Sequence, residues 1–565
     1  MTNASGAPGR HGAFILLRRL RRPLVVLIVI YAVAVLGMTL MPGMDPAGHP
    51  WRMSFLHAFY FISFLGTTIG LGEIPYPFSD AQRLWATGAI YATVVAWLYA
   101  IGALFAVLQD PTFRRLLHES GLQRELRRLR EPFYLLCGYD DAGFRVAREL
   151  TEDGTRVVVM DIDPARVEAV DVDDHRVDVP ALRADASDPK SMLLAGLRSP
   201  YCRGVLALTG SDQINTKVAL TARLLNAAAP VLCAARDHAW HARMATAGAD
   251  HIINPFDTFA ERMGIALRTP SLHVIYEALT TQAGTASAQP TRLPRGRWVL
   301  CGWNLFARAL RRQLERHDIA TTVVAPELDD SCDASNSVRG DPTEVATLRE
   351  ARVHEADVLV VCTDIDIDNL AIVLEAKALR KSLFVIARQN QRRNGAVFRA
   401  APCDLVMLSG YLVAAEVLRH VRAPLLSKFL RRARDEDEDW AAALLERLRE
   451  VVGEEVLESW TMSVTVQNLP AVWQALSSGQ TVTLRRLMTR PDGSGQLVRA
   501  VPLLLQRGQE RRMLPLLHTP LIANDQVLFC GRELARTRLL GFALTRMLAP
   551  ETAPDAPAVL EESAR

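Results

Sequence analysis

Apolar residues gather in two long runs near the start of the chain, and the remainder alternates short apolar stretches with mixed ones. The long runs cover residues 24–41 and 84–108. A helix of about 17–25 apolar residues crosses a hydrocarbon layer about 30 Å thick, so both runs have the length of a membrane span. A third apolar run, residues 53–66, is too short to cross and has the length of a half-helix that enters the membrane. The pattern therefore predicts the order span, half-helix, span.

The segment between the half-helix and the second span carries the motif Thr68-Ile69-Gly70-Leu71-Gly72. Its two glycines can take positive φ, which residues with a Cβ resist, so successive carbonyls can point the same way. Rings of such carbonyls replace the hydration shell of K⁺ in channel filters. One loop gives a quarter of a ring, so four chains are required. A simple turn is the alternative, and it is disfavoured because irregular backbone at membrane depth must line a cavity or be buried in protein.

Arginines flank the two long runs on the same side of the predicted membrane: Arg18, Arg19, Arg21 and Arg22 before the first run, and Arg114 and Arg115 after the second. By the positive-inside rule, both ends of the chain are expected in the cytoplasm. The first run is too long for the core of a signal peptide and has no cleavage-like end, so we expect it to remain as an anchor.

Composition limits the classes of function. The chain has 565 residues, of which 22% are charged, which fits three or four domains and two spans on a large soluble body. The formal net charge of +3 is too small to indicate a nucleic-acid partner. Eight scattered cysteines include no C-x-x-C pair, so we expect reduced thiols in a cytosolic body, without a disulfide framework or a zinc site.

Beyond residue 131, short apolar strands alternate with helical patterns, with strands expected at 133–137, 156–161, 205–208 and 231–235. Such alternation predicts a parallel sheet with helices on both faces. The pattern then recurs. Residues 298–302 match 134–138, Gly340-Asp341 matches Ala184-Asp185, residues 366–369 match 212–215, and Ile386-Ala-Arg388 matches Ala234-Ala-Arg236. The sequence therefore predicts a tandem repeat of one Rossmann-like unit.

The remaining boundaries follow from changes in composition. We expect a pore module at residues 1–108, a charged linker at 109–131, a first Rossmann-like domain at 132–290, a small-residue linker at 281–294, a second such domain at 295–435, an acidic run at 435–439, a small α+β lobe at 456–549 and a disordered tail at 550–565. Strands of the lobe are expected at residues 463–466, 481–484 and 527–529.

The first unit carries most of a dinucleotide-binding turn. Gly138 and Gly143 match the first and third glycines of G-x-G-x-x-G, while Asp140 stands at the second. Phosphate would bind at the N-terminus of the next helix, where Asp140 places a like charge. Asp161 ends the second strand, where an acidic residue takes ribose hydroxyls. We expect an adenine nucleotide, NAD or ADP-like, to bind here; the alternative is a core that keeps its turn glycines for packing.

The second unit matches the fingerprint less well. Gly302 is followed by Asn304 and Ala307, and Ala325-Pro326 replaces the ribose-binding acid. A structural repeat without a nucleotide site is therefore the favoured interpretation.

Three carboxylates stand at alternate positions, Asp364, Asp366 and Asp368. Hard cations such as Ca²⁺ bind oxygen clusters of this kind. Acidic residues at the start of a helix also serve as N-caps, and we favour this second interpretation. The acidic run at 435–439 is likewise interpreted as a solvated face.

Taken together, the motif, the two spans and the doubled units resemble ligand-gated bacterial potassium channels that carry two regulator-of-K⁺-conductance (RCK) domains per chain. The segment I-G-L-G-E-I-P at residues 69–75, followed by Q-R-L-W at 82–85, is similar to the multi-ligand-gated branch. The resemblance implies a homotetramer in the lipid bilayer of the bacterial inner membrane, K⁺ in the filter, and an octameric cytoplasmic RCK ring whose ligands pull on the inner helices. Some relatives also bind Ca²⁺ in this ring.

The resemblance also implies a set of nucleotide-binding positions. In this chain they are Gly138, Tyr139, Asp140, Gly143, Asp161, Ile162, Asp185, Ala186, Thr209 and Arg236. No catalytic constellation is seen, so we do not expect an enzyme.

The chain departs from the family pattern in two places. Leu71 replaces an aromatic residue of the filter, so no hydroxyl ties the filter to the half-helix. Residues 92–96 lack a hinge glycine, which leaves Gly102 as the deep candidate for bending, with close helix packing as its alternative role.

Other function classes remain open. A weakly selective monovalent cation channel is kept because of Leu71. A membrane-anchored nucleotide-sensing regulator and a membrane-anchored oxidoreductase are also considered, although neither class needs a filter motif.

Overall fold

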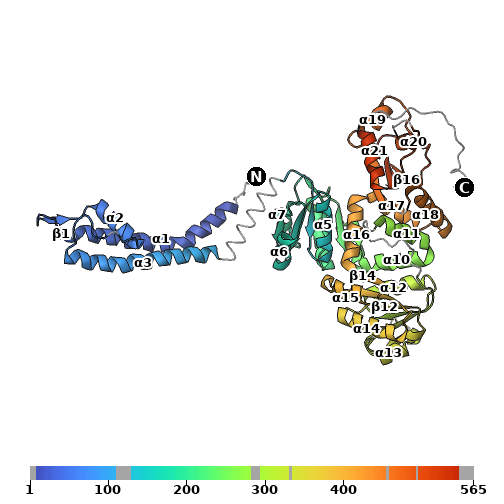
Figure 1. Cartoon of the computed structure of the whole chain (residues 1–565), viewed down its shortest axis with the longest axis horizontal. Coiled ribbons are helices and arrows are strands. Elements are labelled where there is room, and N and C mark those ends of the chain that lie inside the picture. Colours follow the sequence, from blue (N-terminus) through green and yellow to red (C-terminus); the bar gives the residue numbers. More distant parts are fainter. Residues whose placement is uncertain are drawn as a thin grey trace. The chain divides into compact units, whose positions relative to one another are not determined.

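The computed structural model describes residues 8–70, 72–109, 129–280, 293–329, 332, 334–453, 457–490 and 494–545. The chain divides into two compact units, Met1–Arg130 and Glu131–Arg565 (Figure 1). Most of the predicted linkers at 109–131 and 281–294 lies outside the described residues, as do the whole tail at 550–565, Arg114 and Arg115. The finer domain boundaries therefore stay predictions.

The first unit follows the predicted order of elements: α1 (Pro8–Leu40), β1 (Pro42–Met44), β2 (Pro50–Arg52), α2 (Phe55–Gly66) and α3 (Asp80–Leu108). Among the described residues, two helices are long and apolar enough to cross a membrane, over Leu20–Leu40 and Asp80–Leu108. Helix α3 begins at Asp80 rather than at residue 84, because Ser79 and Gln82 form a capping box. Strands β1 and β2 pair antiparallel in the segment that joins α1 to α2.

Two tryptophans of α3 join it to α1. Trp85 donates from Nε1 to the Ala34 carbonyl at 3.0 Å, and Trp97 donates from Nε1 to the Tyr31 hydroxyl at 2.7 Å. A Cβ on Gly66, the last residue of α2, would lie 2.1 Å from that hydroxyl oxygen. All three helices are therefore in contact around Tyr31, just before the filter motif begins.

The second unit opens with a six-stranded parallel sheet in the order β5-β4-β3-β6-β7-β8. Its strands are β3 (Phe133–Cys137), β4 (Arg156–Asp161), β5 (Ala181–Arg183), β6 (Cys202–Ala207), β7 (Val231–Ala234) and β8 (His251–Ile253). Its connecting helices are α5 (Asp141–Glu152), α6 (Pro164–Val172), α7 (Pro189–Leu194), α8 (Asp212–Leu225), η1 (His238–Trp240) and α9 (His241–Ala247). This is the doubly wound order of dinucleotide-binding folds, which confirms the predicted Rossmann-like unit.

A second sheet repeats this order as β11-β10-β9-β12-β13-β14. Its strands are β9 (Trp298–Cys301), β10 (Thr321–Ala325), β11 (Ser337–Arg339), β12 (Val358–Val361), β13 (Phe384–Gln389) and β14 (Leu405–Leu408). Its helices are α12 (Leu305–Glu315), η2 (Ala334–Asn336), α13 (Val345–Glu350), η3 (Val353–Glu355), α14 (Asp366–Leu379), η4 (Arg392–Asn394) and α15 (Gly395–Ala400). The predicted tandem repeat is therefore present.

A buried asparagine shows the repeat at atomic detail. Asn215 accepts hydrogen bonds from the backbone N–H and hydroxyl of Thr209 and donates back to its carbonyl at 3.0 Å. Asn369 does the same with Thr363, at 3.1 Å for the donated bond. The predicted equivalence of residues 212–215 and 366–369 is confirmed.

One predicted equivalence is wrong by two residues. The side-chain amide of Asn215 also donates to the Ala234 carbonyl, and that of Asn369 to the Arg388 carbonyl, both at 2.8 Å. Ala234 therefore corresponds to Arg388, and Arg236 corresponds to Asn390. The Ala-Arg dipeptide that ends both segments suggested the earlier match, but the strand pairing aligns the two segments two residues apart.

The two Rossmann units exchange helices. After β8 the chain forms α10 (Pro255–Arg268) and α11 (Pro270–Thr280), and after β14 it forms α16 (Ser409–Arg422) and α17 (Pro424–Ala433). Helix α10 packs on α12, with Phe259 in the core around Phe306, while α16 packs on α5, with Val413 in the core around Val146 (Figure 1). Each helix thus buries its apolar face in the other unit.

The chain then forms a small α+β lobe with the antiparallel order β15-β18-β16-β17. Its elements are α18 (Glu438–Val452), β15 (Glu458–Ser463), α19 (Pro470–Ser477), α20 (Leu484–Met488), β16 (Ala500–Arg507), β17 (Glu510–Met513), β18 (Gln526–Gly531) and α21 (Glu533–Thr545). The strand predicted at 527–529 is present within β18. The strand predicted at 463–466 is wrong, since β15 ends there. The strand predicted at 481–484 is also wrong, because Thr483 caps α20.

Candidate functional site

The filter motif has the backbone that its glycines predict. Gly70 and Gly72 have φ of +65° and +94°, and Thr68 also has a positive φ of 62°. Residues with a Cβ rarely adopt such angles, so this backbone conformation favours glycine at positions 70 and 72. Leu71 lies outside the described residues. The ion-binding role of the motif stays a prediction at this point.

An ion pair lies directly after the motif. The Glu73 carboxylate accepts from Arg83 Nε at 2.8 Å and from a second guanidinium nitrogen at 3.3 Å. It also accepts from the backbone N–H of Phe78 at 2.9 Å. Two-point pairing of this kind fixes orientation as well as distance, so the end of the motif is tied to the start of α3. Both residues belong to the segments at 69–75 and 82–85 that resemble the multi-ligand-gated branch, but the sequence did not indicate their contact.

Gly102 lies in an uninterrupted α3, and a Cβ placed on it would meet no described atom within 4 Å apart from its own turn of helix. Among the residues that the structure describes, no close helix packing explains this glycine. Its role as a hinge stays a prediction.

The glycine turn of the first Rossmann unit requires its glycines. Gly138 has φ of +101°, and a Cβ there would lie 2.8 Å from the backbone of Leu208 and Thr209. A Cβ on Gly143 would lie 2.1 Å from the Gly138 carbonyl oxygen. Strands β3 and β6 and helix α5 therefore approach at a distance that only glycine permits.

Asp140 occupies the N-terminus of α5 with its own carboxylate. It accepts from the backbone N–H groups of Ala142 at 3.0 Å and Gly143 at 3.3 Å. Donors that would bind a phosphate in a G-x-G-x-x-G turn are thus already used.

Asp161 ends β4 as predicted and is 6% exposed. Its carboxylate accepts from the backbone N–H of Tyr139 at 2.7 Å and of Asp163 at 2.9 Å, and it lies 3.4 Å from a guanidinium nitrogen of Arg166. A carboxylate has about four acceptor positions, so these bonds leave capacity for a ribose hydroxyl.

The side chain of Tyr139 points into the protein and not towards the predicted nucleotide site. It is buried, and its hydroxyl donates to Asp173 at 2.8 Å and contacts His175 at 2.9 Å. Burial and the Asp173 carboxylate raise the pKa of Tyr139. Its backbone N–H therefore lies at the predicted site, but its ring does not, whereas the side chain of Ile162 is 66% exposed beside Asp161.

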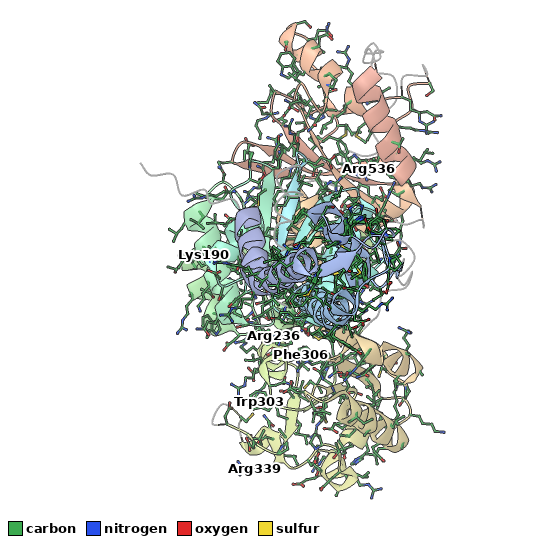
Figure 2. All side chains as sticks on the ribbon, turned by 90° about the vertical axis from the view of Figure 1, so that its left-hand side faces the viewer. Lys190, Arg236, Trp303, Phe306, Arg339 and Arg536 are labelled. Carbon is green, nitrogen blue, oxygen red and sulfur yellow. The ribbon has the colours of Figure 1, made fainter. Side chains whose placement is uncertain are left out.

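The remaining predicted residues lie at the carboxyl ends of the neighbouring strands. Asp185 is exposed and Ala186 is buried after β5, and Thr209 follows β6. Arg236 follows β7 with an exposed side chain (Figure 2). Parallel strands present their carboxyl ends at one edge of the sheet, so all these residues share that edge.

The described residues of the second unit differ from the first at the turn and at the end of the second strand. Asn304 caps α12 by accepting from the backbone N–H of Phe306 and Ala307, both at 3.2 Å, and Trp303 donates from Nε1 to Asp329 at 3.0 Å (Figure 2). No acidic side chain ends β10, which closes with Ala325.

The structure does not gather Asp364, Asp366 and Asp368 into a cation site. Asp366 accepts from the backbone N–H of Asn390 at 2.6 Å and of Gln391 at 3.0 Å, while Asp364 pairs with Arg388 at 2.7 Å. Among the described residues, no group of three His, Cys, Asp or Glu side chains is placed to hold a metal ion. The N-cap interpretation is also incorrect in detail, because α14 has no side-chain cap and Asp366 instead bonds the chain after β13.

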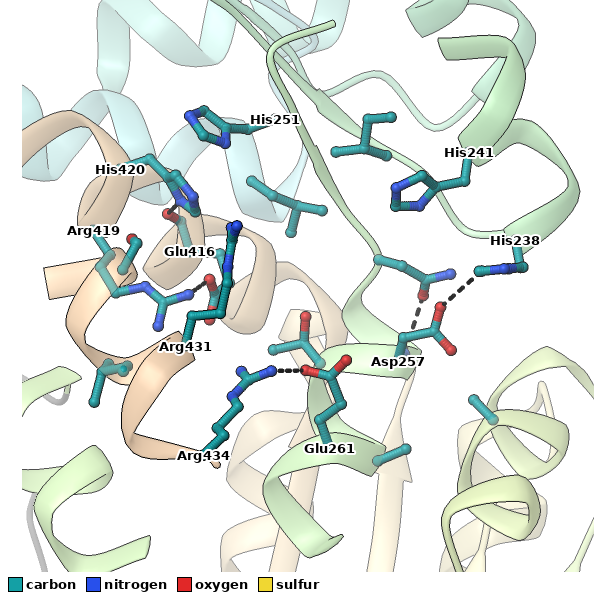
Figure 3. Close-up of a pocket in the computed structure, with 18 of the residues that line it drawn as sticks. His238, His241, His251, Asp257, Glu261, Glu416, Arg419, His420, Arg431 and Arg434 are labelled. Carbon is teal, nitrogen blue, oxygen red and sulfur yellow. Dashed lines mark hydrogen bonds and ion pairs between the residues drawn. The ribbon is translucent and has the colours of Figure 1, made fainter. Parts of the chain in front are cut away.

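A polar cavity of about 650 Å³ lies where β8, α9, α10, α12, α16 and α17 meet (Figure 3). Its lining includes His238, His241, His251 and His420, the arginines 312, 316, 419, 431 and 434, and the acidic residues Asp250, Asp257, Glu261 and Glu416. Three of the arginines form ion pairs within the lining, Arg312 with Asp257, Arg419 with Glu416 and Arg434 with Glu261. No local motif in the sequence indicated this cavity, because much of its lining comes from helices that the two units exchange.

The rings of His251 and His420 lie 4.2 Å apart in this cavity. His420 Nδ1 bonds the Glu416 carbonyl at 2.8 Å. Burial, with the nearby Arg419 and Arg431, lowers the pKa of His420 to about 3. His420 is therefore neutral at physiological pH.

Comparison with known proteins supports the two Rossmann units directly. The TrkA-N domain family matches residues 134–255 and 298–409. Potassium channel protein 1 of Methanocaldococcus jannaschii is 24% identical over 203 residues, which cover 36% of this chain and 59% of that protein. The voltage-gated potassium channel Kch of Escherichia coli is 24% identical over 191 residues, which cover 34% and 44%. The match thus spans about three fifths or less of each curated relative.

Among solved structures, the chain is similar to the GsuK channel bound to NAD, with 16% identity, a TM-score of 0.44, and coverage of 94% of this chain and 100% of that one. It is also similar to GsuK bound to ADP, with 21% identity, a TM-score of 0.41, and coverage of 73% and 98%.

Proposed function

We propose that this protein, whose chain carries two TrkA-N domains and two helices of membrane-spanning length, is a ligand-gated potassium channel. One observation carries the proposal. The segment after the half-helix α2 places glycines at φ of +65° and +94° within a Thr-Ile-Gly-Leu-Gly motif. Curated relatives named as potassium channels support K⁺ as the transported ion.

Four copies of the chain would be needed to complete a ring of filter carbonyls. Apolar side chains on the outside of α2 and α3 suit contacts with lipid or with other copies; Phe55, Leu84, Tyr91 and Leu98 are 65–78% exposed. The proposed complex lies in the bacterial inner membrane. Both termini and the RCK domains are in the cytoplasm, where the RCK domains form an octameric ring.

The regulatory ligand that we propose is an adenine nucleotide at the first Rossmann unit. Asp161 would accept a ribose hydroxyl, and Arg236, at the same edge of the sheet, would attract the phosphates. Because Asp140 already caps α5, the phosphates would not use that helix N-terminus unless the Asp140 side chain moved. A moderate rather than a tight affinity follows.

Moderate affinity is sufficient for gating. Moving a gate from 1:99 to 99:1 requires about 5.5 kcal/mol of differential binding, or roughly 1.4 kcal/mol for each of four sites. Each site then needs only about a tenfold preference for one state.

The test is K⁺ flux into liposomes that contain the purified protein. Gly70→Asp should abolish flux, because a Cβ and a charge cannot occupy the centre of a filter. Gly88→Ala is the matched control, since Gly88 lies in α3 with no atom within 4 Å of an added Cβ. Flux that survives Gly70→Asp would refute the pore assignment.

A weakly selective monovalent cation channel is the second candidate, favoured by Leu71. A measurement of the K⁺/Na⁺ permeability ratio separates it from a K⁺-selective channel.

A further inference from the structure

A second cavity, of about 390 Å³, lies between the two Rossmann units. Its lining is Arg145 from α5 of the first unit and Gln389, Arg392, Arg393, Gly395, Ala396, Phe398, Arg399, Val406 and Leu408 from the second. Four of these ten residues are arginines and none is acidic. The volume falls within the range of small-molecule sites, about 300–1,000 Å³.

The four arginines are not neutralised by carboxylates. Across the described residues, none of the four forms an ion pair of 4 Å or less. Arg145 lies 5.5 Å from the centre of the Tyr411 ring, and Arg392 lies 4.0 Å from that of Phe144. These contacts position the guanidinium groups without cancelling their charge.

Arg145 is the most constrained of the four. It is half-buried, and its Nε atom is buried with no hydrogen-bond partner. Burial, reinforced by the neighbouring Arg392, lowers the pKa of Arg145. The unpaired Nε–H of Arg145 and its repulsion by Arg392 both cost free energy. An anion that accepted a hydrogen bond from this Nε–H would remove that cost.

One acidic side chain near this cluster is Asp141. Asp141 begins α5, and Arg392 of the second unit lies near enough to its carboxylate to stabilise the negative charge. It is close enough to attract Arg392 and Arg145 but does not line the cavity.

We propose that this cavity binds a small anion that carries at least two phosphate groups. Guanidinium groups pair with phosphate in a two-point geometry, and four of them suit a ligand of two or more charges. Phe398, Val406 and Leu408 provide an apolar wall for the remainder of the ligand. The site is distinct from the glycine turn, since Asp161, Asp185, Thr209 and Arg236 do not line the cavity.

Such a ligand would couple the two Rossmann units. Arg145 reaches the cavity because α16, which follows β14 in the second unit, packs on α5 of the first. A bound anion contacts both units at once, so its affinity depends on their relative position and it favours the arrangement that closes the cavity. This inference concerns binding alone and does not depend on ion conduction.

Calorimetric titration of the full-length protein in detergent with inorganic pyrophosphate, at constant ionic strength, tests the proposal. We expect saturable binding that Arg145→Gln and Arg399→Gln each weaken about ten- to a hundredfold, the effect of losing one charge-assisted hydrogen bond. Arg148→Gln is the matched control, because Arg148 lies on α5 one turn beyond Arg145 and pairs with Glu152. It should leave binding unchanged.

The outcomes separate this site from the nucleotide site. Asp161→Ala should not affect pyrophosphate binding; loss of binding in this variant, with none in the arginine variants, would place pyrophosphate at the glycine turn and overturn the proposal. Absence of pyrophosphate binding by the wild type would also overturn the proposal. If Arg399→Gln then changed the oligomeric mass of the protein, the arginines would be assigned to contacts between copies of the chain. Arg399 is exposed, so its variant keeps the test valid if Arg145→Gln does not fold.

Discussion

The carboxylate of Asp140 accepts a hydrogen bond from the backbone N–H of Gly143 at 3.3 Å. In a G-x-G-x-x-G turn this N–H faces the phosphates of the ligand. The chain thus places a fixed negative charge where a dinucleotide would place its own. This relationship sets the expected affinity of the first Rossmann unit.

Replacement of Asp140 by asparagine should therefore strengthen nucleotide binding. Asp140→Asn keeps an oxygen that caps α5 and removes the charge, so we expect NAD affinity to rise about tenfold, equivalent to about 1.4 kcal/mol. Calorimetric titration measures this change. Asp171→Asn, which neutralises an exposed carboxylate on α6, is the control. Equal or weaker binding in Asp140→Asn would show that the phosphates lie elsewhere.

The two Rossmann units should differ in nucleotide binding. Asp161 supplies a ribose acceptor in the first unit, whereas the second ends β10 with Ala325. We expect one nucleotide site of moderate affinity per chain, which Asp161→Ala weakens roughly ten- to a hundredfold and Glu327→Ala leaves intact. The stoichiometry from calorimetry decides the matter. Two equivalent sites per chain, or loss of binding only in Glu327→Ala, would show that the nucleotide site has been assigned to the wrong unit.

The contact between Gly66 and Tyr31 should limit the stability of the pore module. A Cβ at position 66 would lie 2.1 Å from the Tyr31 hydroxyl oxygen, which also accepts from Trp97. Overpacking of this kind costs about 1–3 kcal/mol. We expect Gly66→Ala to lower the melting temperature of the purified protein by several degrees, with Gly88→Ala unchanged. Equal melting temperatures would mean that α1, α2 and α3 do not meet as described.

Acid should weaken the junction that contains His420. Its pKa falls from an ordinary 6.5 to about 3 in the folded protein, so the unfolded chain binds more protons below pH 6.5. The associated stability is complete above pH 6.5 and is lost as the pH falls towards 3. Between pH 7 and pH 5 this loss amounts to about 2 kcal/mol. The charged or titratable groups that act on His420 are His251 on β8, Arg419 on α16 and Arg431 on α17. The Glu416 carbonyl on α16 bonds its Nδ1.

Chemical denaturation at pH 7 and pH 5 measures that loss. His420→Gln should lose less stability between the two pH values than the wild type, whereas His354→Gln, a change at an exposed histidine on η3, should behave as the wild type. An unchanged pH dependence in His420→Gln would contradict the assignment of the acid sensitivity to this residue.

Much of the fold could be predicted because it depends on local patterns. Apolar run lengths predicted α1, α2 and α3, and the repeated strands predicted two doubly wound sheets. The positive φ of Gly70, Gly72 and Gly138 followed from the absence of a Cβ. These features are determined by residues that are close in the sequence.

Other features depend on tertiary partners that a single sequence does not reveal. The apolar faces of α10 and α16 indicate burial, but not that each helix packs in the other Rossmann unit. Residues 481–484 alternate buried Val482 and Leu484 as a strand would, yet the Thr483 hydroxyl accepts from the N–H of Arg486 and starts α20 instead. The arginine cavity joins residues from α5 to β14, so no local motif could have indicated it.

Bilayer recording with K⁺ on one side and Na⁺ on the other tests the central claim most directly. We predict a reversal potential displaced strongly towards the K⁺ equilibrium potential, current that is absent in Gly70→Asp, and an open probability that changes when adenine nucleotide is added on the cytosolic side. A reversal potential near zero would contradict K⁺ selectivity and favour the weakly selective channel. If correctly folded protein carried no current under any ligand condition, the assignment as a channel would be contradicted.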